Sequence, residues 1–120
     1  MSVKRFFLFF VLLYSFSVFS QKNVSVKEAK QLIQTTRRLQ IVDVRTISEY
    51  KQGHISNSIL IDWKNQQTFD LLAKKQLKKR RPILVYCRSG RRSSAAMKRL
   101  VDLGFKTVYN LEGGIIAWNK

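Results

Sequence analysis

The apolar run from Ile83 to Tyr86 constrains the fold of this chain more than any other segment. It is apolar at every position, which is typical of a parallel strand buried on both faces of a sheet. Pro82 ends the helix-like segment before it, and a second helix-like segment, residues 94–103, follows it. Because strands alternate with helices along the chain, we expect a parallel α/β sheet.

Apolar periodicity and capping patterns predict the other elements. Ser25 and Thr46 each open a capping box with a glutamate three residues later. The expected helices are residues 26–34, a short piece from Thr46 that stops near Gly53, residues 69–80, residues 94–103 and a last short piece that holds Trp118. The expected strands are residues 39–44, 59–61, 83–86 and 107–109. Together they predict a small domain whose parallel sheet, of about five strands, is flanked by helices on both faces.

The first twenty residues differ in composition from the rest. Lys4 and Arg5 precede a 14-residue apolar run, residues 6–19, and Val18 and Ser20 occupy the −3 and −1 positions of a cut before residue 21. This pattern is typical of a secretory signal peptide, so we expect a periplasmic or secreted protein. An uncleaved membrane anchor is the alternative, although 14 residues fall short of the roughly 20 that span a bilayer. The expected organisation is a signal peptide, residues 1–20, and one domain, residues 21–120.

Cys87 is the only cysteine of the chain, so the protein cannot form a disulfide within itself. The residue follows the apolar strand, where ligands of open α/β sheets collect and where backbone N–H groups favour an anion. Arg88, Arg91 and Arg92 add positive charge. All these effects favour thiolate over thiol, which predicts an activated sulfur nucleophile. A buried, inert cysteine is the alternative.

Three motifs, in this order and spacing, strongly resemble those of single-domain rhodaneses, and the resemblance covers about residues 24–119. The first motif of the family resembles Asp43-Val44-Arg45, Glu49-Tyr50 and Gly53-His54-Ile55. Its active-site loop resembles Cys87-Arg88-Ser89-Gly90-Arg91-Arg92. Its closing motif resembles Leu111-Glu112-Gly113-Gly114 with Ala117-Trp118. Each motif alone would be a weak signal.

The resemblance implies a thiosulfate sulfurtransferase that works without a metal or an organic cofactor. The Cys87 thiolate would take the outer sulfur of thiosulfate or a polysulfide as a persulfide, and cyanide or a thiol would then accept it. Backbone N–H groups from Arg88 through Ser89, Gly90 and Arg91 to Arg92 could surround the sulfur. By analogy, Arg88 and Arg92 are the better candidates for direct substrate contact, and Gly90 lets the loop curve inward.

The length of the loop separates this chemistry from a related one. Protein tyrosine phosphatases and related arsenate reductases place cysteine and arginine as C-x5-R, whereas Cys87 and Arg92 give C-x4-R, with Ser93 at the longer spacing. The shorter loop resembles the sulfurtransferase branch. Two alternatives remain open: a persulfide carrier, or a non-catalytic binding module, either of which would serve a protein partner.

Several conspicuous residues are interpreted as structural. His54, the only histidine, is expected to support the fold rather than act as a base for Cys87. Asp43, Arg45 and Glu49 are expected to form one buried hydrogen-bonded group that ties strand to helix, with Glu49 also capping at Thr46. The two tryptophans, at positions 63 and 118, are expected to pack in the core.

The chain is strongly basic, with a formal net charge of +16. Much of this charge lies in the run 74–81, which we interpret as the solvated face of an amphipathic helix that also attracts anionic donors from solution. Binding of nucleic acid or anionic lipid by this run is the alternative. Nucleic acid is not expected as a partner, because the run lacks interleaved aromatic residues. A membrane is expected only through an uncleaved N-terminal segment.

Overall fold

The computed structural model describes residues 19–120, and the signal peptide expected over residues 1–20 lies almost wholly outside the described residues. In chain order the elements are β1 (Ser20–Val24), α2 (Val26–Thr35), β2 (Gln40–Asp43), α3 (Ile47–Gln52), β3 (Ile59–Leu60), α4 (Gln66–Gln76), β4 (Ile83–Tyr86), α5 (Arg91–Asp102), β5 (Thr107–Leu111) and α6 (Gly114–Trp118). None of the helices within residues 19–120 is long and apolar enough to cross a bilayer.

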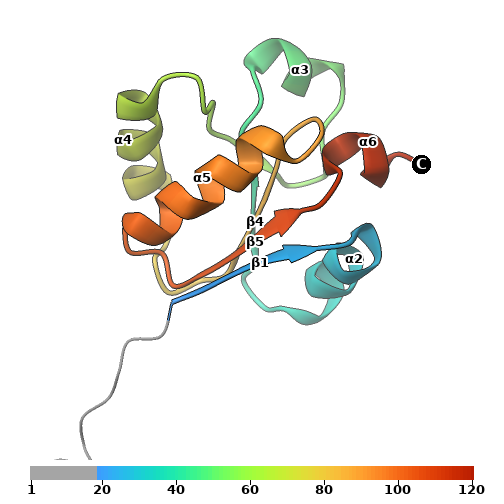
Figure 1. Ribbon diagram of the computed structural model, residues 1–120, viewed down its shortest axis with the longest axis horizontal. Helices are drawn as coiled ribbons and strands as arrows, with labels where there is room; N and C mark the ends of the chain where they lie inside the picture. Colours follow the sequence, from blue (N-terminus) through green and yellow to red (C-terminus); the bar gives the residue numbers. More distant parts are fainter. Residues whose placement is uncertain (1–18) are drawn as a thin grey trace, which may run out of the picture.

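The five strands form one parallel sheet in the order β1-β5-β4-β2-β3 (Figure 1). The predicted α/β class and the parallel sheet of about five strands are thus confirmed. Strand β4 lies in the middle, paired with β2 on one side and with β5 on the other. Because all strands are parallel, the loops after their carboxyl ends lie at one edge of the sheet, and the loop after β4 lies at its centre.

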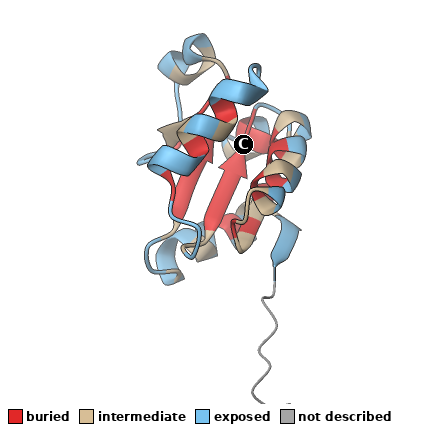
Figure 2. Cartoon of the chain, turned by 90° about the vertical axis from the view of Figure 1, so that its left-hand side faces the viewer, coloured by how far each residue is buried: buried red, intermediate tan, exposed pale blue. Residues whose placement is uncertain are grey.

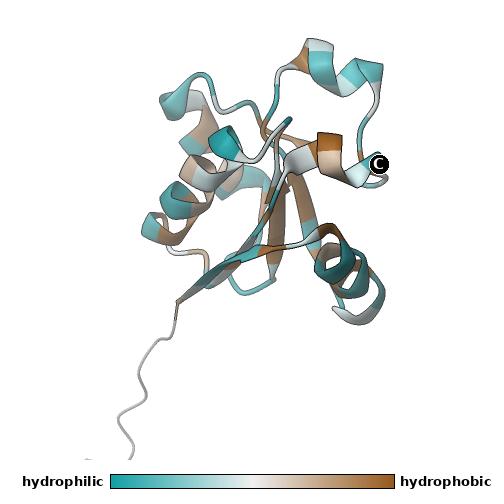
Figure 3. Ribbon diagram, turned by 45° about the vertical axis from the view of Figure 1, so that its right-hand side comes forward, coloured by the Kyte–Doolittle hydropathy of each residue, from teal (hydrophilic) through white to brown (hydrophobic). Residues whose placement is uncertain are grey.

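Helices cover both faces of the sheet and bury one apolar layer against each. Side chains of α4 and α5 pack on one face with Ile83 and Val85 of β4. On the other face, α2 and α6 pack with Leu84 and Tyr86. Strands β2 and β4 are therefore buried along their whole length between the helices, whereas β1 at the edge of the sheet is mostly exposed (Figure 2). Hydrophobic and hydrophilic residues alternate along the helices (Figure 3).

Both capping boxes and the central strand agree with the expectations from sequence. Ser25 and Thr46 accept the N3 backbone N–H of α2 and α3, and each N3 glutamate bonds back to the cap backbone. Strand β4 spans the predicted residues. Strand β1 was not predicted, because its sequence is almost wholly polar.

Two predicted helices were wrong in their bounds. The helix expected over residues 69–80 is α4, which begins three residues earlier, capped by Asn65, and ends at Gln76. The helix expected over residues 94–103 is α5, which begins at Arg91 directly after Gly90. The residues from 91 to 93 therefore form the first turn of α5 rather than part of a loop.

Candidate active site

Cys87 lies directly after the central strand with its side chain 1% exposed. The backbone N–H of Gly90 donates to its sulfur at 3.1 Å, and the hydroxyl of Ser93 donates to it at 3.3 Å. Ser93 belongs to the first turn of α5 and is itself buried. Two donors from the loop and the helix thus point at one sulfur, which is the arrangement that stabilises a negative charge on that atom. Ser93 had no role in the site predicted from sequence.

The environment of Cys87 favours the thiolate. Burial raises the pKa of the thiol, but hydrogen bonds from the Ser93 side chain and from the backbone N–H groups of Ser93, Gly90 and Ser89 lower it by more. The pKa of Cys87 therefore lies below its ordinary value. The lowered pKa agrees with the thiolate expected from sequence, and hydrogen bonds to the sulfur are its main cause. The role of Cys87 as a nucleophile stays a prediction.

We expect the rate of iodoacetamide alkylation of Cys87 to rise with pH through a midpoint below about 8.5, the value of a free cysteine. Ser93→Ala removes one donor to the sulfur and will move this midpoint upward. The control is Ser94→Ala, which lies next to it on the same helix and leaves the midpoint unchanged. A midpoint at or above that of free cysteine in the unmodified protein would contradict the thiolate interpretation.

The short helix α6 is hydrogen-bonded to the backbone of the loop. The N–H of Ile115 donates to the carbonyl of Cys87 at 2.9 Å, and the N–H of Ile116 donates to the carbonyl of Arg88 at 3.2 Å. A Cβ on Gly114 would lie 2.3 Å from the Arg88 oxygen and 2.6 Å from the Cys87 oxygen. This close approach explains why the closing motif needs a glycine at this position.

Gly90 gives the loop its inward turn, as predicted. Its φ of 101° lies in the left-handed region, which turns the chain into α5, and its N–H donates to the Cys87 sulfur. Its carbonyl accepts from the side-chain amide of Asn110 at 3.4 Å, and the same amide donates to Asn23 at 3.0 Å. The curvature of the loop is thus supported by side chains from β5 and β1.

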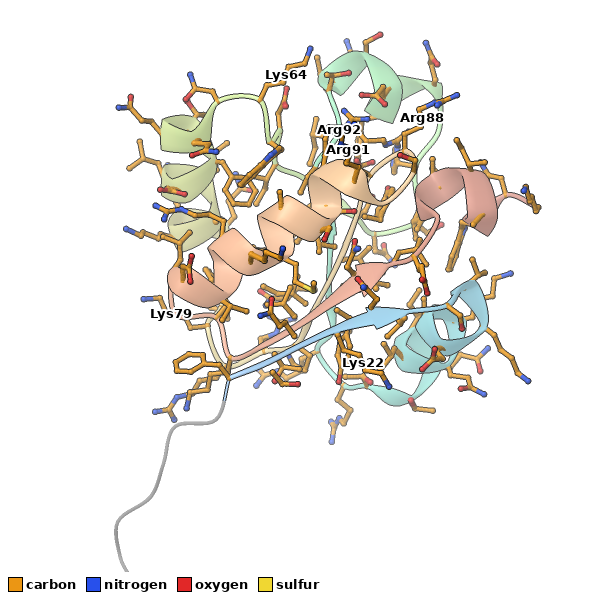
Figure 4. All side chains as sticks on the ribbon, viewed as in Figure 1. Lys22, Lys64, Lys79, Arg88, Arg91 and Arg92 are labelled. Carbon is orange, nitrogen blue, oxygen red and sulfur yellow. The ribbon has the colours of Figure 1, made fainter. Side chains whose placement is uncertain are left out.

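The three arginines of the loop take different positions. Arg92 donates to both carboxylate oxygens of Glu49, at 2.8 and 2.9 Å, and joins α5 to α3. Arg88 and Arg91 are exposed, and both lie near the loop that joins β4 to α5 (Figure 4). Direct substrate contact by Arg88 and Arg92 stays a prediction.

Arg92 also changes the interpretation of Glu49. Glu49 was expected to form one buried group with Asp43 and Arg45. In the described part of the chain, the Glu49 carboxylate instead accepts from the backbone N–H of Thr46, which closes the capping box of α3, and from Arg92. The expected single group was therefore wrong, because Glu49 points toward the active-site loop. The hydrogen bonds of Arg92 lower the pKa of Glu49 to about 2.

We expect Glu49→Gln to lower kcat/KM for sulfur transfer by about fivefold to thirtyfold. The amide still caps α3 but loses the charge that holds Arg92, and a charge-assisted bond at a half-buried site is worth about 1–2 kcal/mol. Asp70→Asn is the matched control, since Asp70 pairs with Arg99 of α5 in the same two-pronged way but away from the loop. Because the Asp70–Arg99 pair is open to solvent, we expect Asp70→Asn to change the free energy of unfolding less than Glu49→Gln does, and to leave kcat/KM unchanged.

The Glu49–Arg92 pair also predicts how the site responds to acid. A carboxyl group whose pKa is lowered on folding stabilises the protein above its unfolded pKa, about 4.3, and this stabilisation is lost as the pH falls through about 2. The pair therefore stays charged across the neutral and mildly acidic range. Any loss of activity between pH 5 and 7 is expected to follow the thiol instead.

The remaining part of the first motif is structural. Arg45, buried, donates to both carboxylate oxygens of Asp43 and to the carbonyl of Gly53. The Tyr86 hydroxyl accepts from the backbone N–H of Ile55, and burial raises the pKa of Tyr86 to about 12. These contacts fix the end of β4, from which the loop starts.

His54 is exposed and stacks on Tyr50 with ring centroids 3.7 Å apart. One of its ring nitrogens lies 2.9 Å from the Tyr50 carbonyl oxygen. The contacts of its ring are thus within α3 and the turn that follows it, as the structural interpretation requires. Trp63 packs edge-on against Phe69. Within residues 19–120, no three His, Cys, Asp or Glu side chains gather in a way that could hold a metal ion.

Comparison with known proteins points to one family. A family model described as "Rhodanese-like domain" matches residues 25–120. The thiosulfate sulfurtransferase GlpE of Coxiella burnetii is 36% identical over 97 residues, which cover 81% of this chain and 86% of that protein. A rhodanese-like domain protein from Staphylococcus aureus has a TM-score of 0.70 at 32% identity, covering 81% of this chain and 90% of the other.

A second group of relatives is much longer. The tRNA uridine(34) hydroxylase of Chlamydia trachomatis is 37% identical over 101 residues, which cover 81% of this chain and 31% of that protein. The chain thus spans about a third of the length of these relatives.

Proposed function

Because the chain belongs to the rhodanese-like domain family, a sulfurtransferase-type family, we propose that it is an exported enzyme that moves a sulfane sulfur from thiosulfate or a polysulfide to a thiophilic acceptor. The observation that carries the proposal is the pair of donors, Gly90 N–H and Ser93 Oγ–H, on the sulfur of Cys87. A binding module would not need two hydrogen-bond donors that stabilise a negative charge on the sulfur of a lone thiol. The resemblance in length and sequence to a thiosulfate sulfurtransferase supports the same conclusion.

In the first half-reaction the Cys87 thiolate attacks the outer sulfur of thiosulfate. A sulfur–sulfur bond forms at Cys87, the sulfur–sulfur bond of thiosulfate breaks, and its electron pair leaves with sulfite. The negative charge on the enzyme moves from Sγ to the outer sulfur of the persulfide. The donors from Gly90 and Ser93 stabilise the sulfur that is charged before attack, and the exposed Arg88 and Arg91 favour the approach of the dianion.

In the second half-reaction the acceptor attacks the outer sulfur of the persulfide. Cyanide would become thiocyanate, and a thiolate acceptor would become a persulfide. In both cases the electron pair of the broken sulfur–sulfur bond returns to Cys87. The thiolate that the loop stabilises is therefore also a good leaving group. The same hydrogen bonds serve both half-reactions, which suits a double-displacement mechanism.

Export is the part of the proposal that rests on sequence. Lys4 and Arg5, the apolar run over residues 6–19 and the small residue Ser20 support it. Cleavage after Ser20 would keep four of the five residues of β1 in the domain. The intact mass of the protein recovered from the periplasm or medium of its host tests this part separately.

Mass spectrometry of the intact protein after thiosulfate treatment tests the catalytic part. We expect a gain of one sulfur atom on Cys87, removed stoichiometrically by cyanide with formation of thiocyanate. A protein that gains no sulfur would be a binding module and not an enzyme. A protein that gains sulfur but passes it only to a protein thiol, and not to cyanide, would be a persulfide carrier.

A further inference from the structure

A cluster of cations occupies the end of the molecule opposite Cys87. Because β4 runs between Arg81 and Cys87, the loops at the amino ends of the strands lie across the sheet from the site. Three of these loops carry seven basic residues, which we call the basal cations: Arg37, Arg38, Lys78, Lys79, Arg80, Arg81 and Lys106. Figure 4 shows Lys79 at the end of α5 away from Arg91 and Arg92.

Backbone and side-chain contacts hold these loops together. Arg81 donates to the carbonyl of Arg38 at 2.9 Å, the N–H of Lys106 donates to the carbonyl of Lys79 at 3.1 Å, and the N–H of Ser20 donates to the carbonyl of Lys106 at 2.7 Å. Loops that lie far apart in the sequence therefore present their charges on one surface. The interpretation of the run 74–81 as a helix face was wrong for its second half, because α4 ends at Gln76.

The basal cations have little acidic counterpart. The four salt bridges among the described residues all involve other cations. Of the described carboxylates, only that of Asp102, the last residue of α5, lies in the adjoining loops and helix ends. Five of the seven basal cations are exposed, and Arg81 and Lys106 are half-buried. This surface is thus an unneutralised positive patch.

The patch is too far from Cys87 to serve the reaction directly. The stretch of extended chain from Arg81 to Cys87 spans about 20 Å. In physiological salt the field of an exposed charge is screened over about 8 Å. Attraction of a small dianion to the active-site loop must therefore come from the arginines of the loop. A partner that the basal cations bind would therefore be a different one, anionic and broad enough to meet charges from three loops.

The apolar run joins the domain at this same surface. Residues 6–19 end at Phe19, which is 48% exposed, and Ser20 begins β1 beside Lys106. An apolar segment next to a cluster of cations is the combination that binds anionic membranes, since the two contributions act together.

We propose that the basal cations bind the anionic headgroups of a phospholipid bilayer, so that Cys87 faces away from the membrane. The surface retains its charge whether or not the apolar run is cleaved, although the apolar run is what favours a membrane over other broad anions. The proposal does not rest on sulfur transfer. The three loops that carry the patch offer no exposed aromatic side chain for stacking on bases, since Phe105 is buried; the nearest exposed one is Phe19, before β1. A membrane therefore fits better than a single-stranded nucleic acid.

Partition of the full chain onto lipid vesicles tests the proposal. The patch variant carries Arg37→Gln, Lys78→Gln, Lys79→Gln and Arg80→Gln. The matched control variant carries Lys27→Gln, Lys51→Gln, Lys64→Gln and Lys120→Gln, which remove the same charge from exposed positions outside the three basal loops. The quantity measured is the ratio of partition coefficients for vesicles with and without phosphatidylglycerol in phosphatidylcholine. This ratio removes the contribution of the apolar run, which is present in all three proteins.

A cation near an anionic surface contributes about fivefold to binding. We expect the patch variant to lose at least about tenfold in the ratio and the control variant less than about twofold, with equal melting temperatures. Equal losses in both variants would mean that net charge alone binds the lipid, and would overturn the proposal. So would a patch variant that keeps the ratio but loses binding to a single-stranded RNA oligonucleotide.

The orientation has its own measurement. We expect iodoacetamide to alkylate Cys87 at the same rate, within about twofold, in free and vesicle-bound protein, because the site lies on the far side of the domain. A large decrease in rate on anionic vesicles, retained in the patch variant, would place the membrane at the active-site edge and contradict the proposal.

Discussion

Cys87→Ser will abolish the gain of sulfur from thiosulfate and lower thiocyanate formation by at least about a thousandfold, while the melting temperature changes by only a few degrees. The serine oxygen can accept the same two hydrogen bonds, from Gly90 and Ser93, so the loop keeps its shape. It is not ionised near neutral pH and is a far weaker nucleophile toward sulfur. The variant is therefore expected to lose sulfur transfer and to keep its fold.

Intact mass and the thiocyanate assay measure the two outcomes on the same sample. Cys87→Ser protein with substantial thiocyanate formation would sink the assignment of the nucleophile. An unfolded variant would show that Cys87 is needed for packing, since it belongs to the apolar layer beneath α4 and α5. In that case Cys87→Ala, which removes the sulfur without placing a polar group in that layer, separates the two roles.

Gly114→Ala will strongly lower both the free energy of unfolding and kcat/KM. The new Cβ would overlap the carbonyl oxygens of Arg88 and Cys87, at 2.3 and 2.6 Å. Since these atoms are backbone, relief requires α6 to move away and lose the hydrogen bonds from Ile115 and Ile116 to the same carbonyls. We expect a loss of about 3–5 kcal/mol in the free energy of unfolding, and at least a tenfold loss in kcat/KM.

Gly104→Ala is the matched control for Gly114→Ala. Gly104 also has a positive φ, of 100°, but a Cβ there would meet only the flexible end of the Lys79 side chain, at 3.5 Å. Gly104→Ala should lower the free energy of unfolding only by the backbone strain at a positive φ, about 1 kcal/mol or somewhat more. It should leave the titration of Cys87 unchanged. Equal effects of the two substitutions in chemical denaturation would show that α6 does not support the loop.

The central part of the fold could be predicted because its signals are local. The strand at Ile83 is apolar at each position and is bounded by Pro82 and the polar loop, so both of its ends are marked. The starts of α2 and α3 follow from capping boxes that need only four residues each. The order of strand, cysteine loop and helix then places the nucleophile without knowledge of the rest of the chain.

The end of α4 could not be predicted, since its cause lies far away in the sequence. The side chain of Gln40 accepts the N–H of Lys78 and donates to the carbonyls of Lys78 and Arg81. It thereby supplies partners to the backbone after Gln76, although the sequence there continues to favour a helix. The contact spans 38 residues, and no pattern within residues 69–80 shows it.

The role of Glu49 escaped prediction for a similar reason. Its capping function is visible in the sequence, but its second partner, Arg92, lies 43 residues away. A carboxylate and an arginine in two separate motifs can each pair with several groups. Only the placement of α3 over the start of α5 selects this pair.

The position of β1 has a consequence for the order in which the chain can fold. This strand is the first element described, and it pairs only with β5, the last strand; Asn23 and Asn110, which bond across the pair, are 87 residues apart. Bringing together segments so distant is slow compared with forming local contacts. During synthesis the amino-terminal stretch can thus gain its sheet partner only after nearly the whole chain has been made. Until then it stays available to any machinery that binds an extended chain, and closure of the sheet at this edge completes the domain.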